Sequence, residues 1–316
     1  MRLPVELEIA SQLPPSGASL ERAQQYTRWL AKHHYENFTV ATYLLPRDLR
    51  QHFYNIYAFC RWADDLADEI PDPEIALQAL GWWGQQLRQC YAGSITHPVF
   101  IALRRTVERF NIPIEPFADL LTAFRQDQTV HRYQTWESLM QYCRHSANPV
   151  GRLVLYLSGH CDEERQVLSD FTCTALQLTN FWQDVSRDLE KDRIYIPVEA
   201  LAANGLSESD LFSRRFDERY ASLMRALVSR TRQLFESGLP LANSVRLELR
   251  FQIELFSRGG LAVLDAIESI GYNTLQRRPA LGSVAKLRIF SHTYAKRYGI
   301  GSLLRALSQP RMGRSA

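Results

Sequence analysis

The 316-residue sequence lacks the short motifs by which many enzymes bind nucleotides or zinc. It has no glycine-rich phosphate loop, no nucleophile elbow and no zinc-ligand spacing. Its five cysteines are odd in number and form no Cys-x-x-Cys pair. That pattern favours buried thiols in a reducing compartment over disulfides or metal thiolates.

Long apolar runs and a secretion signal are also missing. No stretch approaches the roughly 18 uncharged apolar residues that a membrane-spanning helix needs. Residues 1–17 have neither the basic nor the apolar region of a signal peptide. We therefore expect a cytoplasmic protein, which a water-insoluble substrate would bring to the inner face of the membrane. The small net charge of +3 gives no sign of a basic stripe, so no nucleic acid partner is expected.

What remains is the composition of an ordinary globular protein, with 46% apolar and 22% charged residues. No Gly/Pro/Ser-rich linker, repeat or low-complexity tract divides the chain, which favours one domain over two. Apolar residues recur with a helical period in every long segment, and alternating strand patterns are rare. These features predict an all-α, single-domain helical bundle around a central cavity.

The chain is expected to divide into an irregular segment 1–18, a helical domain 19–307 and a disordered basic tail 308–316. A connector is expected at 37–46. Periodicity predicts helices at about 19–35, 51–70, 73–92, 97–110, 116–127, 136–157, 163–189, 208–237, 242–271 and 284–307.

The first unusual feature is the acidic end of the stretch 51–70, QHFYNIYAFCRWADDLADEI. At spacings of three or four residues, one helical face would carry Tyr57, Arg61, Asp64, Asp65 and Asp68. Like charges at i, i+4 repel by about 0.2–0.5 kcal/mol per pair, and the helix dipole is already negative at this end. A frayed, solvated helix end would explain one such cluster, and so would a bound cation.

A second acidic row follows 120 residues later (184 minus 64), in QLTNFWQDVSRDLEKDR. One helical face there would carry Gln177, Asn180, Asp184 and Asp188. Two Asp-x-x-x-Asp pairs on otherwise apolar helices are most simply explained if the two rows face each other. Oxygen ligands without a cysteine or histidine cluster suit Mg²⁺, which binds through one or two carboxylates, waters and substrate phosphates. The rows therefore predict a Mg²⁺-bridged diphosphate site.

A third feature is Pro149, which falls inside the predicted helix 136–157. An interior proline removes a hydrogen bond and costs ~3 kcal/mol or more unless the helix kinks. A kink would create a polar notch near Ser146 and Asn148. This notch would either pack against another helix or hold one water molecule in an apolar wall. The nearby His145 and His160 could act as bases, although a lone histidine is more often structural.

With both acidic rows in place, the sequence resembles the squalene/phytoene synthase family. The resemblance extends from about His34 to Tyr272, and its most specific strings are CRWADDLADE and NFWQDVSRDLEKDRIYIP. It implies an isoprenoid synthase fold in which the two acidic helices face each other across a cavity. They would bind Mg²⁺ and a prenyl diphosphate there.

Matched motif by motif, the resemblance also implies roles for individual residues. Metal ions would be held by the acids and one amide of the two rows, Asp64, Asp65, Asp68, Asn180, Asp184 and Asp188, with Asp65 in a supporting role. Substrate and diphosphate would be bound by Asn37, Phe38, Gln177, Lys191, Arg193 and Tyr195. Catalysis would involve Tyr57, Arg61, Tyr142, Ser146 and Asn148, the last three orienting a water molecule.

Within the family, the strings HYENFTVATYLLP, YCRHSANPVGRL and LQLTNFWQD are most similar to the bacterial hydroxysqualene synthase branch of the hopanoid pathway. Many condensing members carry a Ser-x-Ser-Phe motif before the first acidic helix, whereas this chain has YENF at 35–38. The missing hydroxyls imply a substrate that already contains thirty carbons and a single diphosphate. The expected reaction converts presqualene diphosphate and water into hydroxysqualene and diphosphate, with Mg²⁺ and without NADPH.

Other functions remain open from the sequence. A head-to-head prenyltransferase would join two prenyl diphosphates into presqualene diphosphate, squalene or phytoene. A non-catalytic helical assembly protein would have no use for acidic rows that destabilise their helices, and a terpene cyclase normally has a different second metal motif. In the expected pathway the protein would work alongside a presqualene diphosphate synthase and a squalene-forming oxidoreductase.

Overall fold

The computed structural model describes residues 7–33 and 47–298. Across these two ranges the regular structure is helical, with one isolated backbone bridge between Arg132 and Ile194. The all-α prediction is therefore confirmed. The predicted connector 37–46 and the tail 308–316 lie outside the described residues.

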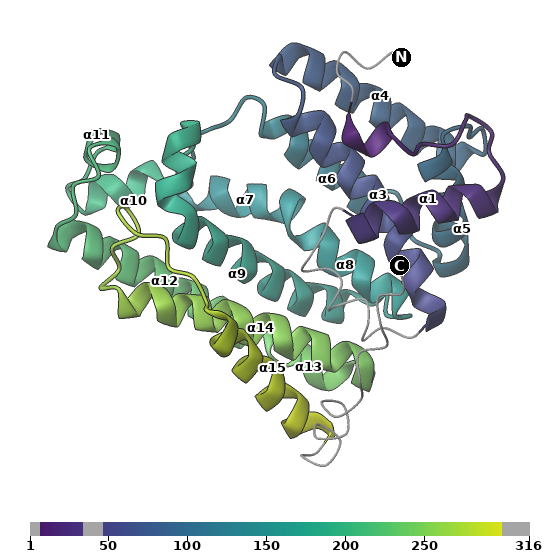
Figure 1. Cartoon of the computed structure of the whole chain (residues 1–316). Helices are drawn as coiled ribbons and strands as arrows, with labels where there is room; N and C mark the ends of the chain where they lie inside the picture. The colour runs from purple at the N-terminus through teal and green to yellow at the C-terminus, as the bar shows by residue number, and fades with distance from the viewer. Residues whose placement is uncertain (1–6, 34–46, 299–316) are drawn as a thin grey trace.

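Figure 1 shows the order of the helices along the chain. A short 3₁₀ turn at Glu8–Ala10 precedes the helices of the first half, which are α1 (Leu20–His33), α3 (Arg47–Asp68), α4 (Pro73–Ala92), α5 (Pro98–Phe110) and α6 (Glu115–Gln126). Those of the second half are α7 (Trp136–Ser146), α8 (Asn148–Leu157), α9 (Glu163–Asp188), α10 (Val198–Ala203), α11 (Glu208–Phe212), α12 (Glu218–Gly238), α13 (Leu241–Ser244), α14 (Leu247–Ser269) and α15 (Ser283–Tyr298). A second 3₁₀ turn, Leu189–Lys191, ends α9.

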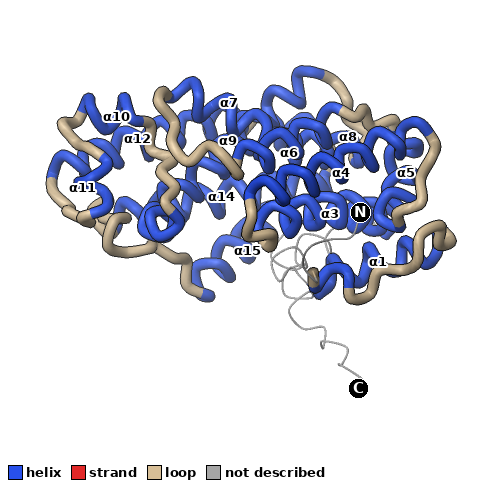
Figure 2. Tube along the Cα trace, turned by 90° about the horizontal axis from the view of Figure 1, so that it is seen from above, coloured by secondary structure: helices blue, strands red, loops and turns tan. Residues whose placement is uncertain are grey.

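Two large apolar cores organise the helices. In the first, α1 and α3–α6 pack around Trp62 and Trp83, whose rings stack with centroids 5.2 Å apart. In the second, α7, α9, α12 and α14 surround the fully buried Trp182 and Tyr220. Seen from above, the helices of the two cores form one elongated array (Figure 2). Both α6 and α8 contact helices of the two halves. The charged ends of α3, α6 and α9 interact there, because Asp64 of α3 interacts electrostatically with Asp127 after α6 and with Lys191 after α9.

Pro149 starts a helix instead of kinking one, so the prediction of one continuous helix over 136–157 was wrong. α7 ends at Ser146, and Pro149 lies in the first turn of α8. A proline is tolerated in this position because the first turn of a helix has no internal partner for a backbone N–H. The polar pair Ser146 and Asn148 therefore flanks a junction between two helices.

Two other predicted helices are also divided in the structure. Helix 208–237 is broken between α11 and α12, where Arg214 has a left-handed backbone with φ of 51°. Asp217 then caps α12 by accepting hydrogen bonds from the backbone N–H groups of Arg219 and Tyr220. Helix 242–271 is broken at Val245, whose backbone is extended. Apolar periodicity continues through such breaks, because it reports burial and not backbone angles.

His97 caps α5 from inside the first core. Its Nδ1 accepts a hydrogen bond of 3.3 Å from the backbone N–H of Val99, and its ring packs edge-on against Trp62 and Trp83. The side chain is almost fully buried, and burial lowers the pKa of His97 to about 3. The folded protein therefore keeps this imidazole neutral.

We expect acid to destabilise the fold through His97. Between pH 6.5 and pH 3 the unfolded chain binds a proton that the folded chain does not, so stability falls as the pH falls. This group alone should cost about 2 kcal/mol of unfolding free energy between pH 7 and pH 5. Urea unfolding at both values should show a smaller loss for His97→Gln than for the wild type, and an unchanged loss for the exposed control His33→Gln. Equal losses in wild type and His97→Gln would contradict this account.

Candidate functional site

The acidic residues of α3 lie on the accessible stripe of an otherwise buried helix. This stripe carries Tyr57, Cys60, Arg61 and Asp64, which are half-buried, and Asp68, which is exposed. The adjoining positions of α3 are part of the first core. The helix therefore presents one row of polar side chains at the point where the two cores meet.

Arg61 is the counterion of this row. It forms an ion pair of 3.3 Å with Asp64 and a second, shorter one with Asp65. Asp65 is only 3% exposed, and burial raises its pKa to about 6. Burial and the neighbouring Asp68 also raise the pKa of Asp64. One arginine thus leaves the row with more negative charge than it neutralises.

The acidic residues of α9 form a second accessible stripe. Gln177, Asp184 and Asp188 are half-buried and Asn180 is exposed, while the adjacent Trp182 is buried in the second core. Burial and the neighbouring Asp184 raise the pKa of Asp188 to about 7. This row, like the first, places carboxylates close to one another in partly desolvated surroundings.

Arg278 is the counterion of Asp184. Its Nε donates to one carboxylate oxygen, and its Nη2 lies 3.2 Å from the other. Arg278 belongs to the segment that leads into α15, 94 positions after its partner. The sequence does not predict a role for Arg278, because an ion pair between residues 94 positions apart leaves no local pattern.

Residues 131–134 hold the segment that follows α9. The backbone N–H of Ile194 donates to the carbonyl of His131 at 3.0 Å. Arg132 bonds Asp192 at 2.5 Å and Glu208 at 2.8 Å. Asp192 itself has a left-handed backbone, which reverses the chain after the 3₁₀ turn. This fixed segment carries two of the candidate binding residues, Arg193 and Tyr195.

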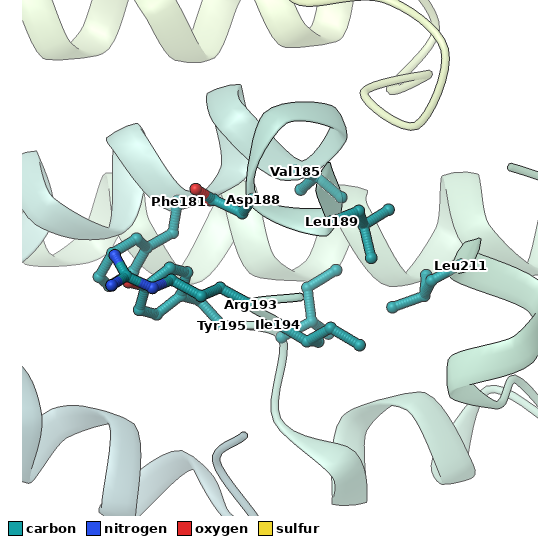
Figure 3. Close-up of a pocket in the computed structure, with 9 residues that line it drawn as sticks. Phe181, Val185, Asp188, Leu189, Arg193, Ile194, Tyr195 and Leu211 are labelled. Atoms are coloured by element: carbon teal, nitrogen blue, oxygen red, sulfur yellow. The ribbon is translucent and has the colours of Figure 1, made fainter. Parts of the chain in front are cut away.

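Arg193 and Tyr195 rest on a wall of aromatic rings. Tyr195 stacks on Phe181 with centroids 3.7 Å apart, and Tyr142 lies 6.1 Å from both rings. Figure 3 shows the polar ends of Asp188 and Arg193 on one side, and an aliphatic cluster that includes Leu211 on the other. Residues 192–197, which we call the strap, therefore separate a charged face from an apolar one.

Asp127 interacts with the acidic row of α3 and with Arg193 in the segment after α9. It follows the last residue of α6, and its carboxylate accepts a hydrogen bond from the hydroxyl of Tyr142. Burial raises the pKa of Asp127 to about 6; Arg193 opposes this shift, and Asp68 and Asp64 add to it. One carboxylate thus interacts electrostatically with residues of α3 and with the strap after α9. Lys191 adds a second link, because it interacts with Asp64.

An apolar cavity adjoins the acidic row of α3. It has a volume of about 210 Å³ and lies between α3 and α8. Its walls are almost entirely hydrocarbon, formed by Phe53, Ile56, Tyr57, Cys60, Val150, Leu153, Val154 and Leu157. Because Tyr57 and Cys60 also belong to the accessible stripe, the charged row and the apolar cavity are neighbours on one helix.

The donor atoms of the two rows suit a hard cation whose coordination is completed by oxygens of the bound substrate. They are carboxylate and amide oxygens. Burial, and after it a neighbouring carboxylate, raises the pKa of Asp64 and of Asp188, and a bound cation would stabilise the charged form of both. Within residues 7–33 and 47–298, no three acidic, histidine or cysteine side chains converge into a ready-made metal cage.

Comparison with known proteins identifies the family. The model of the squalene/phytoene synthase family matches residues 31–284, which include both acidic rows and Asp127. The chain belongs to the squalene/phytoene synthase family. As a member of this family it is an enzyme that acts on prenyl diphosphates.

Individual members of the squalene/phytoene synthase family agree with this assignment. The phytoene synthase of Arthrospira platensis is 31% identical over 277 residues, which cover 82% of this chain and 87% of that protein. The crystal structure of squalene synthase HpnC from Alicyclobacillus acidocaldarius is 45% identical, with a TM-score of 0.78 over 80% of this chain and 96% of that one. A dehydrosqualene synthase in complex with ligand, 24% identical, has a TM-score of 0.77 over 91% of this chain and 98% of that one, which supports the fold.

The remaining candidate residues are placed as follows. Asn37 and Phe38 lie outside the described residues. Ser146 has a buried hydroxyl with no hydrogen-bond partner among the described residues. Asn148 is buried, and its Oδ1 accepts a hydrogen bond of 2.8 Å from Thr174. No helix in the described ranges is long and apolar enough to cross a membrane.

Replacing Asp127 with asparagine should reduce turnover of a prenyl diphosphate substrate by about 100-fold or more. The amide still accepts the hydrogen bond from Tyr142 but removes the charge that faces Arg193. The matched control is Asp119→Asn within α6, where burial also raises the carboxyl pKa but the neighbouring charges are His145, Arg152, Glu115 and Asp170. Steady-state kinetics and thermal melting of both variants check the prediction. Equal activity of the two would show that the charge of Asp127 is not needed.

Proposed function

We propose that this protein converts presqualene diphosphate and water into hydroxysqualene and diphosphate. The observation that carries the proposal is that the charged row of α3, where a diphosphate head group would bind, lies next to an apolar cavity on the same helix. Such a site suits a substrate with one diphosphate and long hydrocarbon arms. The 45% identity to HpnC and the absence of the Ser-x-Ser-Phe motif at 35–38 support this branch of the family.

The acidic rows would hold the metal ions of the reaction. Asp64 and Asp68 would contribute from α3, and Asn180, Asp184 and Asp188 from α9, with Asp65 keeping Arg61 in place. Bound Mg²⁺ supplies positive charge to the departing diphosphate. Arg278 would have to release Asp184 when that carboxylate binds a metal ion.

Basic side chains would bind the diphosphate itself. Arg61 lies within the α3 row, while Lys191 ends the 3₁₀ turn after α9 and Arg193 lies on the strap. Arg278 is the fourth cation at the site, and on release from Asp184 its guanidinium becomes available to a phosphate oxygen. Hydrogen bonds from arginine to phosphate are charge-assisted and geometrically specific, so they orient the leaving group.

The apolar surfaces would protect the carbocation formed when the C–O bond to diphosphate breaks. The cavity between α3 and α8 has walls of hydrocarbon and would receive the hydrocarbon arms of the substrate. The faces of Phe181, Tyr195 and Tyr142 attract positive charge through their π-electrons. Tyr57 and Gln177 would contact the substrate from the accessible stripes of α3 and α9, and Asn37 and Phe38 from the segment before α3.

One positioned water molecule would then capture the rearranged cation. The buried hydroxyl of Ser146 supports a role in holding this water, because it has an unused hydrogen-bonding group among the described residues. Ser146 ends α7, directly before α8, whose Val150 and Leu153 line the cavity. Tyr142 and Asn148 would complete the orientation of the water.

The second candidate is a condensing prenyltransferase that uses two prenyl diphosphates. It is favoured by the similarity to phytoene synthases, which are about 30% identical to this chain. Both candidates use the same head site, and they differ in whether one or two diphosphates bind. Product analysis therefore separates them directly.

Purified protein supplied with presqualene diphosphate and Mg²⁺ should release hydroxysqualene without NADPH, as measured by mass spectrometry of the products. Asp184→Asn should lose this activity with its helicity retained, while Asp265→Asn, an exposed carboxylate paired with Arg232 on α12, should keep it. Consumption of farnesyl diphosphate alone, or squalene formed only with NADPH, would favour the condensing enzyme. Unchanged cellular function in Asp64→Asn and Asp184→Asn would point to a helical assembly protein.

Ser146→Ala should change which products form. Loss of one hydrogen bond to the captured water should lower the fraction of alcohol by about tenfold, relative to hydrocarbons formed when the carbocation loses a proton instead. The control Ser158→Ala removes a hydroxyl that donates only to the carbonyl of Val154 in its own helix. Gas chromatography of products from both variants gives the ratio. An unchanged ratio in Ser146→Ala would remove Ser146 from the water site.

A further inference from the structure

The outer face of α15 is the most exposed apolar surface among the described residues. Val284 is 81% exposed and Leu287, one turn later, is 60% exposed. α15 packs on α14 beside these residues, where Phe290 meets Phe251 with ring centroids 5.7 Å apart. Figure 1 shows α15 lying along the outside of α14. The helix thus packs on α14 and also presents exposed aliphatic side chains.

This face borders a large apolar cavity. The cavity has a volume of about 500 Å³ and lies between α9, α14 and α15. Its walls include Leu176, Phe256 and Phe290, and Phe256 is itself 49% exposed. Lys286 also lines the cavity and directly precedes the exposed Leu287. We call Phe256, Val284 and Leu287 the α15 patch.

The charge of the chain is strongly divided, although its net value is small. Residues 269–316 contain nine Lys and Arg and no Asp or Glu. The preceding 268 residues contain 28 Lys and Arg and all 34 Asp and Glu, a net charge of −6. Lys286 and Arg288 of α15 both belong to the basic part and are exposed. The α15 patch is therefore framed by cations without local countercharge from acidic residues of its own segment.

We propose that the α15 patch docks the protein on an anionic lipid bilayer, beside the mouth of the cavity between α9, α14 and α15. Aliphatic and aromatic side chains framed by lysine and arginine are the combination that binds the boundary between headgroups and acyl chains. The docked protein keeps its apolar cavity open toward the lipid, where a long-chain isoprenoid can pass without crossing water. The inference does not depend on which prenyl diphosphate reaction the acidic rows perform.

Charge favours a bilayer over the other occupants of this face. A second copy of the chain would bring the same basic segment against the first, and the two would repel. The chain's own residues 299–316 contain three arginines and no acid, so they do not neutralise Lys286 and Arg288 either. An anionic headgroup layer supplies both the missing negative charge and an apolar phase for Val284 and Leu287.

Sedimentation of the full-length protein with lipid vesicles tests the proposal. The vesicles are phosphatidylcholine alone, or phosphatidylcholine mixed with phosphatidylglycerol in equal parts. The wild type should bind the mixed vesicles, and binding should weaken with salt and on phosphatidylcholine alone. The double variant Val284→Ser with Leu287→Ser should bind about tenfold more weakly. The double variant Lys286→Gln with Arg288→Gln should lose the preference for phosphatidylglycerol.

The matched control is Phe212→Ser, which removes a 45% exposed aromatic from α11, away from α15 in Figure 1, and should bind like the wild type. Circular dichroism should show that every variant is folded, because the changed residues are exposed. Wild-type protein that stays in the supernatant, or serine variants that bind like the wild type, would overturn the proposal. So would light scattering that shows a wild-type dimer broken by the serine substitutions, with no vesicle binding.

Discussion

The structure depends on how carboxylates are kept where two apolar cores meet. Asp64 and Asp188 both have raised pKa values, first because burial removes water and then because each has a carboxylate neighbour. Hydrophobic packing fixes α3 and α9, so the acids cannot separate to relieve the repulsion. The protein places arginines against them instead: Arg61 on α3, Arg193 on the strap and Arg278 before α15. Each arginine lies where a phosphate or a metal ion could replace one of its interactions.

The need to hold cations near these carboxylates explains why many contacts fix the short strap after α9. Residues 192–197 lie between the 3₁₀ turn and α10 and belong to no helix, yet they carry Arg193 and Tyr195. Backbone hydrogen bonds to 131–134 and the two ion pairs of Arg132 replace that support. The stack of Tyr195 on Phe181 then ties the strap to α9. The backbone of Arg193 is therefore fixed, and its side chain interacts electrostatically with Asp127 and Asp188.

Local pattern was enough to predict the helical class and the faces of α3 and α9. Spacings of three and four residues are a property of one helix, so Tyr57, Asp64 and Asp68 could be assigned to one row from the sequence. Asp127 and Arg278 could not be found in this way, because their significance comes from partners in distant helices. The junction at Ala147 and the break at Arg214 were missed for a related reason. Apolar periodicity passes through both, while backbone angles and side-chain caps end the helices.

The difference between binding one diphosphate and binding two is a question of available positive charge. The described cations near the acidic rows are Arg61, Lys191, Arg193 and Arg278, and each of them already interacts with carboxylates in the absence of substrate. One diphosphate with its metal ions can take over these arginines, because the metal ions then neutralise the carboxylates. A second diphosphate would need further donors, and the segment 35–38 offers YENF where many condensing members have two hydroxyls. The balance of charge thus supports a substrate with a single head and leaves the hydrocarbon surfaces of α3 and α8 to select its arms.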